Sequence, residues 1–438
     1  MSSPARADHD ARPDAADQPR VTFLTQWFDP EPTTMPGWVA RSLRRQGLEL
    51  DVLTGVPNYP TGKVHEGYRA WRRSTEMQGD LRVLRTPLYP SHNHSAVGRS
   101  ANFASFALSS SLLGSAALRH TDVTLVYSTP ATVAAAGMLA RLRWGTPYVL
   151  MVMDIWPDSV FATGFLSGGV TRRLAEPPLN WLTNQTYRWA HHVTATSPGM
   201  RDALVERGVP ADRVSVVYNW TDEKMMRPAA PDPRVRAGLG LTDEFVLMYA
   251  GNHGAAQGLD VAVRAMAELR DLPDVHLVFL GGGIEKPVLR SLAANLNLQT
   301  VHFLDGVEPE QVPAVMAAAD LQLVSLTDQP LFHVTLPSKV QSILACAQPV
   351  LTCAPGDAAR VVHAAGAGFS SPPGDPVQLA QTIRTAAALP RERLRAMGRA
   401  GRDHYLAHLG EEANAFALAD LLRDAARSRR RGPSGGAR

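Results

Sequence analysis

Residues 331–352 place a helix between a loop and a buried strand, and this order constrains the fold more than any other stretch. Their sequence is LFHVTLPSKVQSILACAQPVLT. Pro337 suits the first turn of a helix, apolar residues then repeat at helical spacing, and Pro349 ends the helix. A helix N-terminus attracts phosphate, and Lys339 adds a full positive charge there. An ordinary α/β crossover with a solvated lysine is the alternative.

The same alternation of short apolar strands and helices runs along the chain and predicts an α/β fold with parallel sheets. The length of 438 residues fits two large domains, and the polar, proline-rich stretch 219–233 predicts a hinge between them. We expect a disordered start at 1–20, a first domain at 21–218, a linker at 219–243, a second domain at 244–408, a final helix at 409–426 and a disordered basic tail at 427–438.

Composition argues against several classes of protein. A formal charge of +3 is too small to indicate a nucleic-acid binder. The two cysteines, Cys346 and Cys353, have neither CxxC nor Cys/His spacing, so we expect no metal site and no disulfide framework. Residues 1–20 lack the apolar core of a signal peptide, and together these features favour a cytoplasmic protein.

Residues 101–118 are the nearest approach to a membrane segment. They are apolar but rich in serine and glycine, and slightly short for a bilayer. We favour a buried or groove-lining helix here. A helix lying in the membrane interface is the alternative, which would make the protein peripheral at the inner face of the membrane.

Two loops follow the first two predicted strands. The first, QWFDPEPTTMPG at 26–37, lacks the G-x-G-x-x-G fingerprint and so argues against a dehydrogenase. The second, GVPNYPTGKVHEGY, covers 55–68. Loops after strand C-terminal ends line the ligand crevice of an open parallel sheet, so Glu31, Asn58 and Tyr59 are candidate binding residues. Turn-building is an equally good interpretation of each one.

Asp154 follows YVLMVM, a continuous apolar run typical of a strand buried on both faces. A carboxylate at the C-terminal end of a central strand lies where active sites form in such sheets. The alternative role is to cap the next helix. In the second half, AGNHGAAQG at 250–258 follows another strand, and its glycines would let backbone N–H groups approach a phosphate. A tight strand-to-helix turn is the alternative there.

The sequence resembles the retaining GT-B glycosyltransferases of family 4. Pro337, Ser338 and Lys339, with Ala345 and the downstream Pro349-Val350, resemble the donor-binding helix of that family. The PEP loop, the PNYPTG loop and the DIWPDS segment with the following ATG at 162–164 resemble its subgroup in O-antigen, capsule and colanic-acid type assembly. The match spans about 21–422 and implies two doubly wound Rossmann-like domains facing a central cleft.

The resemblance implies transfer of a sugar from a nucleotide-sugar donor, UDP-linked by preference, to a saccharide or polyprenyl-linked saccharide acceptor. It implies retention by front-face transfer with no metal and no cofactor. Asp154 and Lys339 would be catalytic, and Glu31, Asn58 and Tyr59 would bind the acceptor. The donor would be bound by Gly251, Asn252, His253, Gly254, Leu336, Pro337, Ser338, Lys339, Gln341 and Ser342.

The sequence departs from the family pattern at the donor site. The two glutamates of the family fall at Val334 and Ser342, and the positions of its Arg and Lys hold Asn252 and Gln257. The changes at Val334 and Ser342 favour a donor other than glucose or mannose, such as an N-acetylated deoxysugar on UDP, whereas Asn252 and Gln257 resemble the subgroup and leave more of the positive charge to Lys339. The glycine of the family's A-x-G falls at Ala347, a mild change inside a helix.

Two other functions fit the same sequence. A UDP-sugar 2-epimerase of GT-B fold would act on a sugar nucleotide with no acceptor present. A non-catalytic GT-B subunit would bind a partner transferase, and the missing glutamates allow it.

Overall fold

The computed structural model describes residues 18–91, 96–158 and 169–431, so Ser159 and the 162–164 segment lie outside the described residues. Contacts divide the chain into two compact units, 1–194 with 415–438 and 195–414. Each unit is described by itself. In the part of the chain that the structure describes, no helix is both long and apolar enough to cross a bilayer.

The first sheet has eight strands in the order β3-β4-β2-β1-β5-β6-β7-β8. The pairs β1–β2, β1–β5, β2–β4 and β5–β6 are parallel, whereas β3 runs antiparallel to β4. The sequence analysis did not anticipate the β3–β4 hairpin. The strands are β1 (Arg20–Leu24), β2 (Glu49–Gly55), β3 (Ser74–Gln78), β4 (Leu81–Thr86), β5 (Val123–Ser128), β6 (Tyr148–Val152), β7 (His192–Ala195) and β8 (Val214–Val216).

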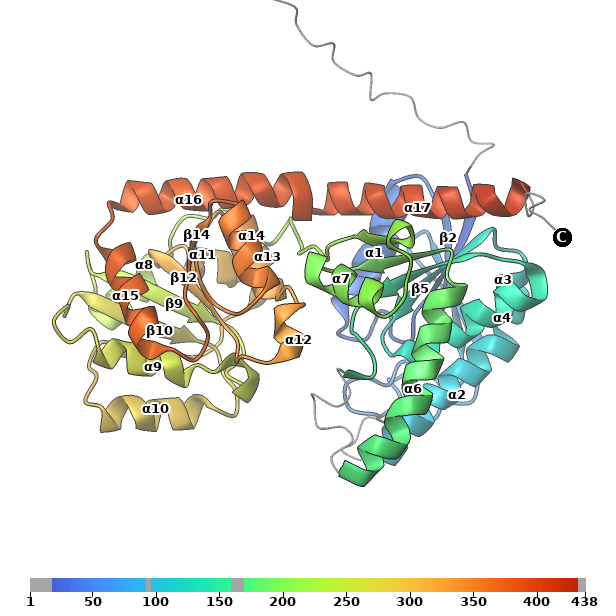
Figure 1. The fold of residues 1–438 in the computed structure, drawn as a ribbon, viewed down its shortest axis with the longest axis horizontal. Helices are drawn as coiled ribbons and strands as arrows, with labels where there is room; N and C mark the ends of the chain where they lie inside the picture. Colours follow the sequence, from blue (N-terminus) through green and yellow to red (C-terminus); the bar gives the residue numbers. More distant parts are fainter. Residues whose placement is uncertain (1–17, 92–95, 159–168, 432–438) are drawn as a thin grey trace, which may run out of the picture. The chain divides into compact units, whose positions relative to one another are not determined.

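Helices connect these strands (Figure 1). They are α1 (Thr34–Arg45), α2 (Ala96–Leu113), α3 (Ser115–Arg119), α4 (Ala134–Trp144) and α6 (Gly169–Trp189), followed by α7 (Pro198–Glu206), which belongs to the second unit. Helix α4 packs against both α2 and α6. The strand order reverses between β1 and β5, which is where open parallel sheets of this kind form their ligand crevice.

The second sheet has six parallel strands in the order β11-β10-β9-β12-β13-β14, so its order reverses between β9 and β12. Its strands are β9 (Phe245–Ala250), β10 (Val275–Leu280), β11 (Val301–Leu304), β12 (Leu321–Ser325), β13 (Val350–Cys353) and β14 (Gly368–Ser370). Its helices are α8 (Pro233–Leu239), α9 (Asp260–Ala267), α10 (Lys286–Asn295), α11 (Val312–Met316), α12 (Pro330–His333), α13 (Ser338–Ala345), α14 (Asp357–Ala364), α15 (Pro376–Ala387) and α16 (Arg391–His404).

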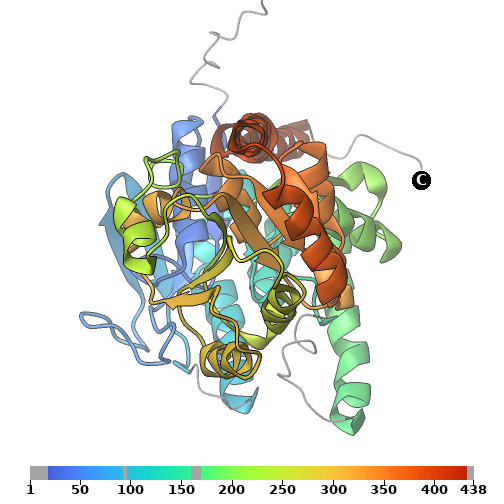
Figure 2. The same cartoon turned by 90° about the vertical axis from the view of Figure 1, so that its left-hand side faces the viewer.

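Alternate strand residues of the second sheet enter different apolar cores, as the period of two requires. On β9, Leu247 and Tyr249 pack with α9, α10 and α15, whereas Val246 and Met248 pack with α8 and α11. Helices α13 and α14 build a further core. Figure 2 shows helices on both sides of these strands. The predicted α/β class with two parallel-sheet units is therefore confirmed.

The basic stretch at the C-terminal end differs from its prediction. Helix α17 extends over Glu411–Arg431, so the first five residues of the predicted disordered tail are helical. The last turn is held to the first unit because Arg429 donates hydrogen bonds to the carbonyl oxygens of Thr121 and Trp144. Arg423 also donates to the Gln46 carbonyl, at 2.7 Å. The sequence pattern of charged and apolar residues does not show which backbone atoms a side chain will bind, so these hydrogen bonds were not predicted.

Ala347 does not lie inside a helix, which corrects the sequence-based expectation. Helix α13 ends at Ala345 and Cys346 is its C-cap. Ala347 then adopts a φ of +55°, the left-handed conformation that glycine occupies most readily at this position. A left-handed alanine costs about 1–2 kcal/mol, so this end of α13 stores local strain.

We predict that Ala347→Gly stabilises the protein. Glycine removes the strain of the left-handed alanine, and this gain is larger than the cost of the conformational entropy that glycine adds to the unfolded chain. The free energy of unfolding should therefore rise by about 0.5–1 kcal/mol. Calorimetry should therefore show a higher Tm. The matched control is Ala400→Gly in the exposed middle of α16, which should lower stability by about 1 kcal/mol. A lower Tm for Ala347→Gly would contradict the prediction.

Candidate active site

A cavity of about 310 Å³ lies in the second unit beside the C-terminal ends of β9 and β10. Helix α13 contributes its first turn to the same cavity. The position is the point where the strand order reverses, the usual ligand crevice of a doubly wound sheet. The lining consists of Met226, Ala250, Gly251, Leu280, Gly281, Gly306, Val307, Val312, Met316, Gln322, Ser338, Lys339, Ser342 and Ile343.

The Lys339 ammonium is the cationic group of this cavity. Its Nζ lies 3.4 Å from the centre of the Tyr249 ring, a cation–π contact. Among the described residues, no carboxylate forms an ion pair with it. Burial lowers the pKa of Lys339 to about 7 because its charge has lost hydration without gaining a counter-ion. The cavity thus holds a cation that an anionic ligand would stabilise.

Tyr249 is itself held in place. Its hydroxyl donates a hydrogen bond of 2.7 Å to the Asn252 carbonyl, and its ring packs against His253 and Phe279. The ring therefore fixes the place of the Lys339 ammonium. The sequence analysis did not single out Tyr249, since an aromatic residue in a buried strand is the ordinary pattern.

Glycines allow the loops after β9 and β10 to touch backbone to backbone. The His253 N–H donates to the Gly282 carbonyl at 2.7 Å. Gly281 has a φ of +120°, and a Cβ there would lie 2.3 Å from the Gly251 oxygen. Gly251 has a φ of +137°, and its Cβ would lie 2.9 Å from the Lys339 Nζ. The glycines thus build a tight turn and also leave room for the lysine.

The predicted donor residues separate into two groups. Gly251, Ser338, Lys339 and Ser342 line the cavity. The others do not: Asn252, His253, Gly254, Leu336, Pro337 and Gln341. His253 is fully buried between aromatic rings, and burial lowers the pKa of its imidazole. Gln341 is buried and donates to the Asn219 carbonyl at 2.6 Å, so its amide serves the hinge segment.

Ser342 is the residue at the position of the family's second glutamate. Its hydroxyl lies 3.3 Å from the Thr221 hydroxyl while it lines the cavity. It can therefore offer a neutral hydrogen bond to a ligand, without a charge. Gln257 lies at one of the two positions where the family has Arg and Lys. Its side chain accepts a hydrogen bond from the Gly254 N–H at 3.0 Å and closes the turn.

Much of the cavity is apolar, which sequence reasoning missed. Met226, Val307, Val312, Met316 and Ile343 come from four separate segments. Their sequence signal is that of ordinary core residues, so only the fold reveals that they meet at one cavity. Such a lining suits a flat ring, whereas Lys339 suits an anion.

In the first unit, Glu31 and Asn58 are engaged in building their loops. The Glu31 carboxylate accepts hydrogen bonds from the backbone N–H groups of Phe28, Asn58 and Tyr59 at 3.1, 2.7 and 2.8 Å. Burial raises the pKa of Glu31, and these N–H groups oppose the shift. The Asn58 amide donates to the Val56 carbonyl. The structure thus agrees with the turn-building interpretation of both residues.

Tyr59 belongs to a chain of partly exposed aromatic rings at the C-terminal edge of the first sheet. Its ring centroid lies 5.3 Å from that of Trp27. Trp27 lies 6.2 Å from Phe103, and Phe103 lies 6.1 Å from Trp156. All four rings are half-buried. We call them the aromatic row, and apolar ring faces of this kind are suited to packing on the ring of a sugar.

Asp154 lies two residues after β6, at the same edge of the sheet, and its side chain is exposed. Loss of hydration raises the pKa of Asp154, while an interaction with Thr129 opposes the shift. The alternative role as a helix cap concerns a segment that continues outside the described residues. Among the residues that are described, no group of three or more His, Cys, Asp or Glu side chains could hold a metal ion.

Two family models match the chain. A glycosyl transferase 4-like domain matches residues 32–220, and the model of glycosyl transferases group 1 matches 232–404. Together they cover every strand of the two sheets except β1, and all of the cavity lining except Met226. Similar proteins of known sequence include WcaI of Escherichia coli (strain K12), named for colanic acid biosynthesis, which is 30% identical over 70% of this chain and 76% of its own length.

WbjE of Pseudomonas aeruginosa, named as a glycosyltransferase, is 25% identical over 60% of this chain and 66% of its own length. Solved structures share the fold. Sucrose-phosphate synthase of Thermosynechococcus elongatus has a TM-score of 0.67 at 18% identity, covering 93% of this chain and 99% of its own. Anabaena HepE in complex with UDP has a TM-score of 0.64 at 17% identity, covering 92% and 100%.

The fold is therefore that of a GT-B glycosyltransferase. The chain belongs to family 4 of these enzymes, in the type that takes part in polysaccharide biosynthesis. The resemblance stated from the sequence is confirmed at this level.

Proposed function

We propose that the protein transfers a sugar, with retention of configuration, from a UDP-linked donor to a saccharide or polyprenyl-linked saccharide in cell-surface polysaccharide biosynthesis. The observation that carries the proposal is the Lys339 ammonium, which borders an otherwise largely apolar cavity without a carboxylate partner among the described residues. A nucleoside diphosphate offers both parts that such a cavity lacks, a flat base and a dianionic group. HepE, of the same fold, has been solved with UDP and with UDP-glucose.

In the proposed reaction, the bond between the anomeric carbon and the diphosphate oxygen breaks while a bond to the acceptor oxygen forms on the same face. The acceptor proton passes to the leaving diphosphate. Lys339 and the N–H groups of the first turn of α13 stabilise the negative charge that develops on that leaving group. Asp154 interacts with the sugar while the bond between the sugar and the diphosphate breaks. No step requires a metal or a cofactor.

The aromatic row of the first unit supports an acceptor role for the loops of that unit. Tyr59 and Trp27 present partly exposed rings at the strand ends, where the sequence analysis expected acceptor contacts. Glu31 and Asn58 contribute by fixing the loop that carries Tyr59. We therefore assign Glu31 and Asn58 as positioning residues, with Tyr59 in contact with the saccharide.

A peripheral contact with the inner face of the membrane is part of the proposal, because it would bring the protein to a polyprenyl-linked acceptor. On α2, the exposed residues Val97, Ala101, Ala104, Leu108 and Leu112 recur at helical spacing. Leu108 is 63% exposed and Leu112 is 58% exposed. We call these five residues the α2 stripe. Arg119 follows on α3, so the stripe joins apolar area to positive charge, the combination that binds anionic bilayers.

The affinity for UDP is predicted to fall as the pH rises above 7. Below the free-state pKa of Lys339, about 7, the ammonium is already charged. Above it, the lysine must regain a proton to pair with the diphosphate, which costs up to about tenfold in affinity per pH unit. Calorimetry in buffers of different ionisation enthalpy should detect uptake of about half a proton at pH 7.

The matched control is Lys339→Met, which keeps the length of the side chain and removes its charge. It should weaken UDP binding at pH 6.5 by at least about tenfold and leave only the pH dependence of the nucleotide itself. Equal affinity and an equal pH profile in both proteins would remove Lys339 from the donor site.

Asp154→Asn tests the chemical step. The variant should keep its affinity for the nucleotide, since Asp154 does not line the cavity. Its kcat for transfer should fall by at least about 100-fold, the typical effect of removing one charge-stabilising group at a reacting centre. Transfer would be followed by the release of UDP with the acceptor fraction of a cell membrane extract. Unchanged turnover would reduce Asp154 to a helix cap.

Replacement of Leu108 and Leu112 by glutamine tests the membrane contact. Burial of each leucine is worth about 1.5–3 kcal/mol, so binding to anionic vesicles should weaken by at least tenfold. Ser100→Gln, on another exposed position of α2, is the control and should bind as the unaltered protein does. Vesicle flotation that is equal for all three proteins would show that the α2 stripe does not contact the bilayer.

A further inference from the structure

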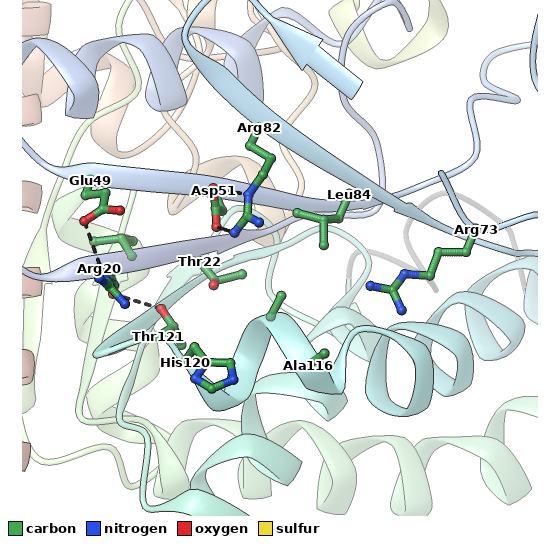
Figure 3. Close-up of a pocket in the computed structure, with 12 residues that line it drawn as sticks. Arg20, Thr22, Glu49, Asp51, Arg73, Arg82, Leu84, Ala116, His120 and Thr121 are labelled. Carbon is green, nitrogen blue, oxygen red and sulfur yellow. Dashed lines mark hydrogen bonds and ion pairs between the residues drawn. The ribbon is translucent and has the colours of Figure 1, made fainter. Parts of the chain in front are cut away.

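A second cavity, of about 230 Å³, lies in the first unit between α3 and the strands β1, β2 and β4 (Figure 3). It is lined by Arg20, Val21, Thr22, Glu49, Asp51, Arg73, Arg82, Leu84, Ala116, Ala117, His120 and Thr121. Arg20 and Glu49 begin β1 and β2, so the cavity adjoins the N-terminal starts of these strands. The aromatic row and Asp154 instead follow strand C-terminal ends.

Polar side chains form a row across the sheet inside this cavity. Thr22 is paired in register with Asp51, and Asp51 with Arg82, so the three side chains emerge on the same face. The Arg82 guanidinium binds both oxygens of the Asp51 carboxylate, one of them at 3.0 Å from Nε. Arg20 lies 3.5 Å from Glu49. Each of the two carboxylates therefore has its own arginine.

Arg73 supplies the one positive charge of the cavity that neither of its carboxylates balances. Three arginines and two carboxylates line the cavity, and in the described part of the chain the Arg73 side chain has neither an ion-pair nor a hydrogen-bond partner. Its guanidinium extends toward the space between the sheet and α3 (Figure 3). The cavity thus has a net positive charge, with a free donor group at its side.

Thr22 gives an independent indication of a ligand. The residue is 2% exposed and lines the cavity, yet its hydroxyl has no hydrogen-bond partner among the described residues. The hydroxyl oxygen itself is not sealed from solvent, so it can donate a hydrogen bond to a group that enters the cavity. His120, at the end of α3, offers an imidazole from the opposite wall (Figure 3).

We propose that this cavity is a binding site for a phosphate group, separate from the donor and acceptor sites. Arg73, Thr22 and His120 come from a loop, a strand and a helix end, and offer donors from three directions. A tetrahedral phosphate presents oxygens in several directions, whereas a planar carboxylate presents two in one plane. The volume equals that of roughly eight waters at about 30 Å³ each, enough for a phosphate and part of the molecule that carries it.

Free phosphate compounds and lipid headgroups share this chemistry. The lipid source has geometric support: α3, whose Ala116 and Ala117 line the cavity, directly follows the exposed Leu112 and Leu113 of α2. The site does not depend on the proposed transfer reaction, because none of its residues belongs to the donor cavity or the aromatic row.

The test is a calorimetric titration of the full chain with inorganic phosphate. It is run on the Lys339→Ala variant, so that the donor cavity contributes as little as possible. Arg73→Gln should weaken phosphate binding by at least about tenfold, and Thr22→Val, which removes only the hydroxyl, by about tenfold. Arg72→Gln is the matched control, because Arg72 is an exposed neighbour that does not line the cavity. Far-UV circular dichroism and the Tm check that each variant folds.

A second arm measures flotation with vesicles of phosphatidic acid in phosphatidylcholine, compared with phosphatidylcholine alone. If the protein binds only the acidic vesicles and this binding requires Arg73, the source is a lipid headgroup. If the protein binds inorganic phosphate in solution and this binding requires Arg73, the source is a free phosphate compound. Either result supports the site. Phosphate and vesicle binding that are both absent, or both unaltered in Arg73→Gln and Thr22→Val, would overturn the proposal.

Discussion

The half-buried ammonium of Lys339, with no counter-ion among the described residues, is the constraint on which the candidate site depends. The Tyr249 ring, whose centre lies 3.4 Å from Nζ, stabilises the cation, whereas the partial positive charge at the start of α13 does not, so an anionic ligand would be stabilised by both positive groups. The loops must leave room for the lysine, which requires glycine at 251, and Gly281 must let the two loops touch. The largely apolar lining then keeps the charge poorly hydrated. Together these features make the cavity complementary to an anion attached to a flat ring.

The two units divide the work in the proposed mechanism. The second unit would bind the part of the donor that leaves, and its cavity is built at the reversal of strand order between β9 and β12. The first unit would bind the acceptor with rings whose positions depend on Glu31, a carboxylate saturated by three backbone N–H groups. The identity of the donor sugar would depend on neutral contacts such as the Ser342 hydroxyl, since the charged residues of the family pattern are absent from these positions.

The sequence predicted those features that depend on local periodicity. It predicted both sheets, the glycine-rich loop after β9, and Lys339 at the start of a helix. It missed the hairpin of β3 and β4, of which β3 (Ser74–Gln78) lacks an apolar alternation. It also missed the apolar cavity lining, whose members look like core residues. It also could not foresee that Gln341 turns toward the Asn219 carbonyl, because the direction of a side chain depends on tertiary partners. The sequence analysis placed Ala347 inside a helix, whereas α13 ends two residues earlier and Ala347 is left-handed.

The most direct test of the central claim is a thermal-shift screen of the purified chain against UDP, GDP, ADP and dTDP, with and without Mg²⁺. A ligand that binds only the folded state raises the Tm by mass action, by an amount that grows with its concentration relative to Kd. The account predicts a shift with UDP that needs no Mg²⁺ and that Lys339→Ala reduces. No shift with any nucleotide at millimolar concentration would contradict the account and favour a non-catalytic subunit of the same fold.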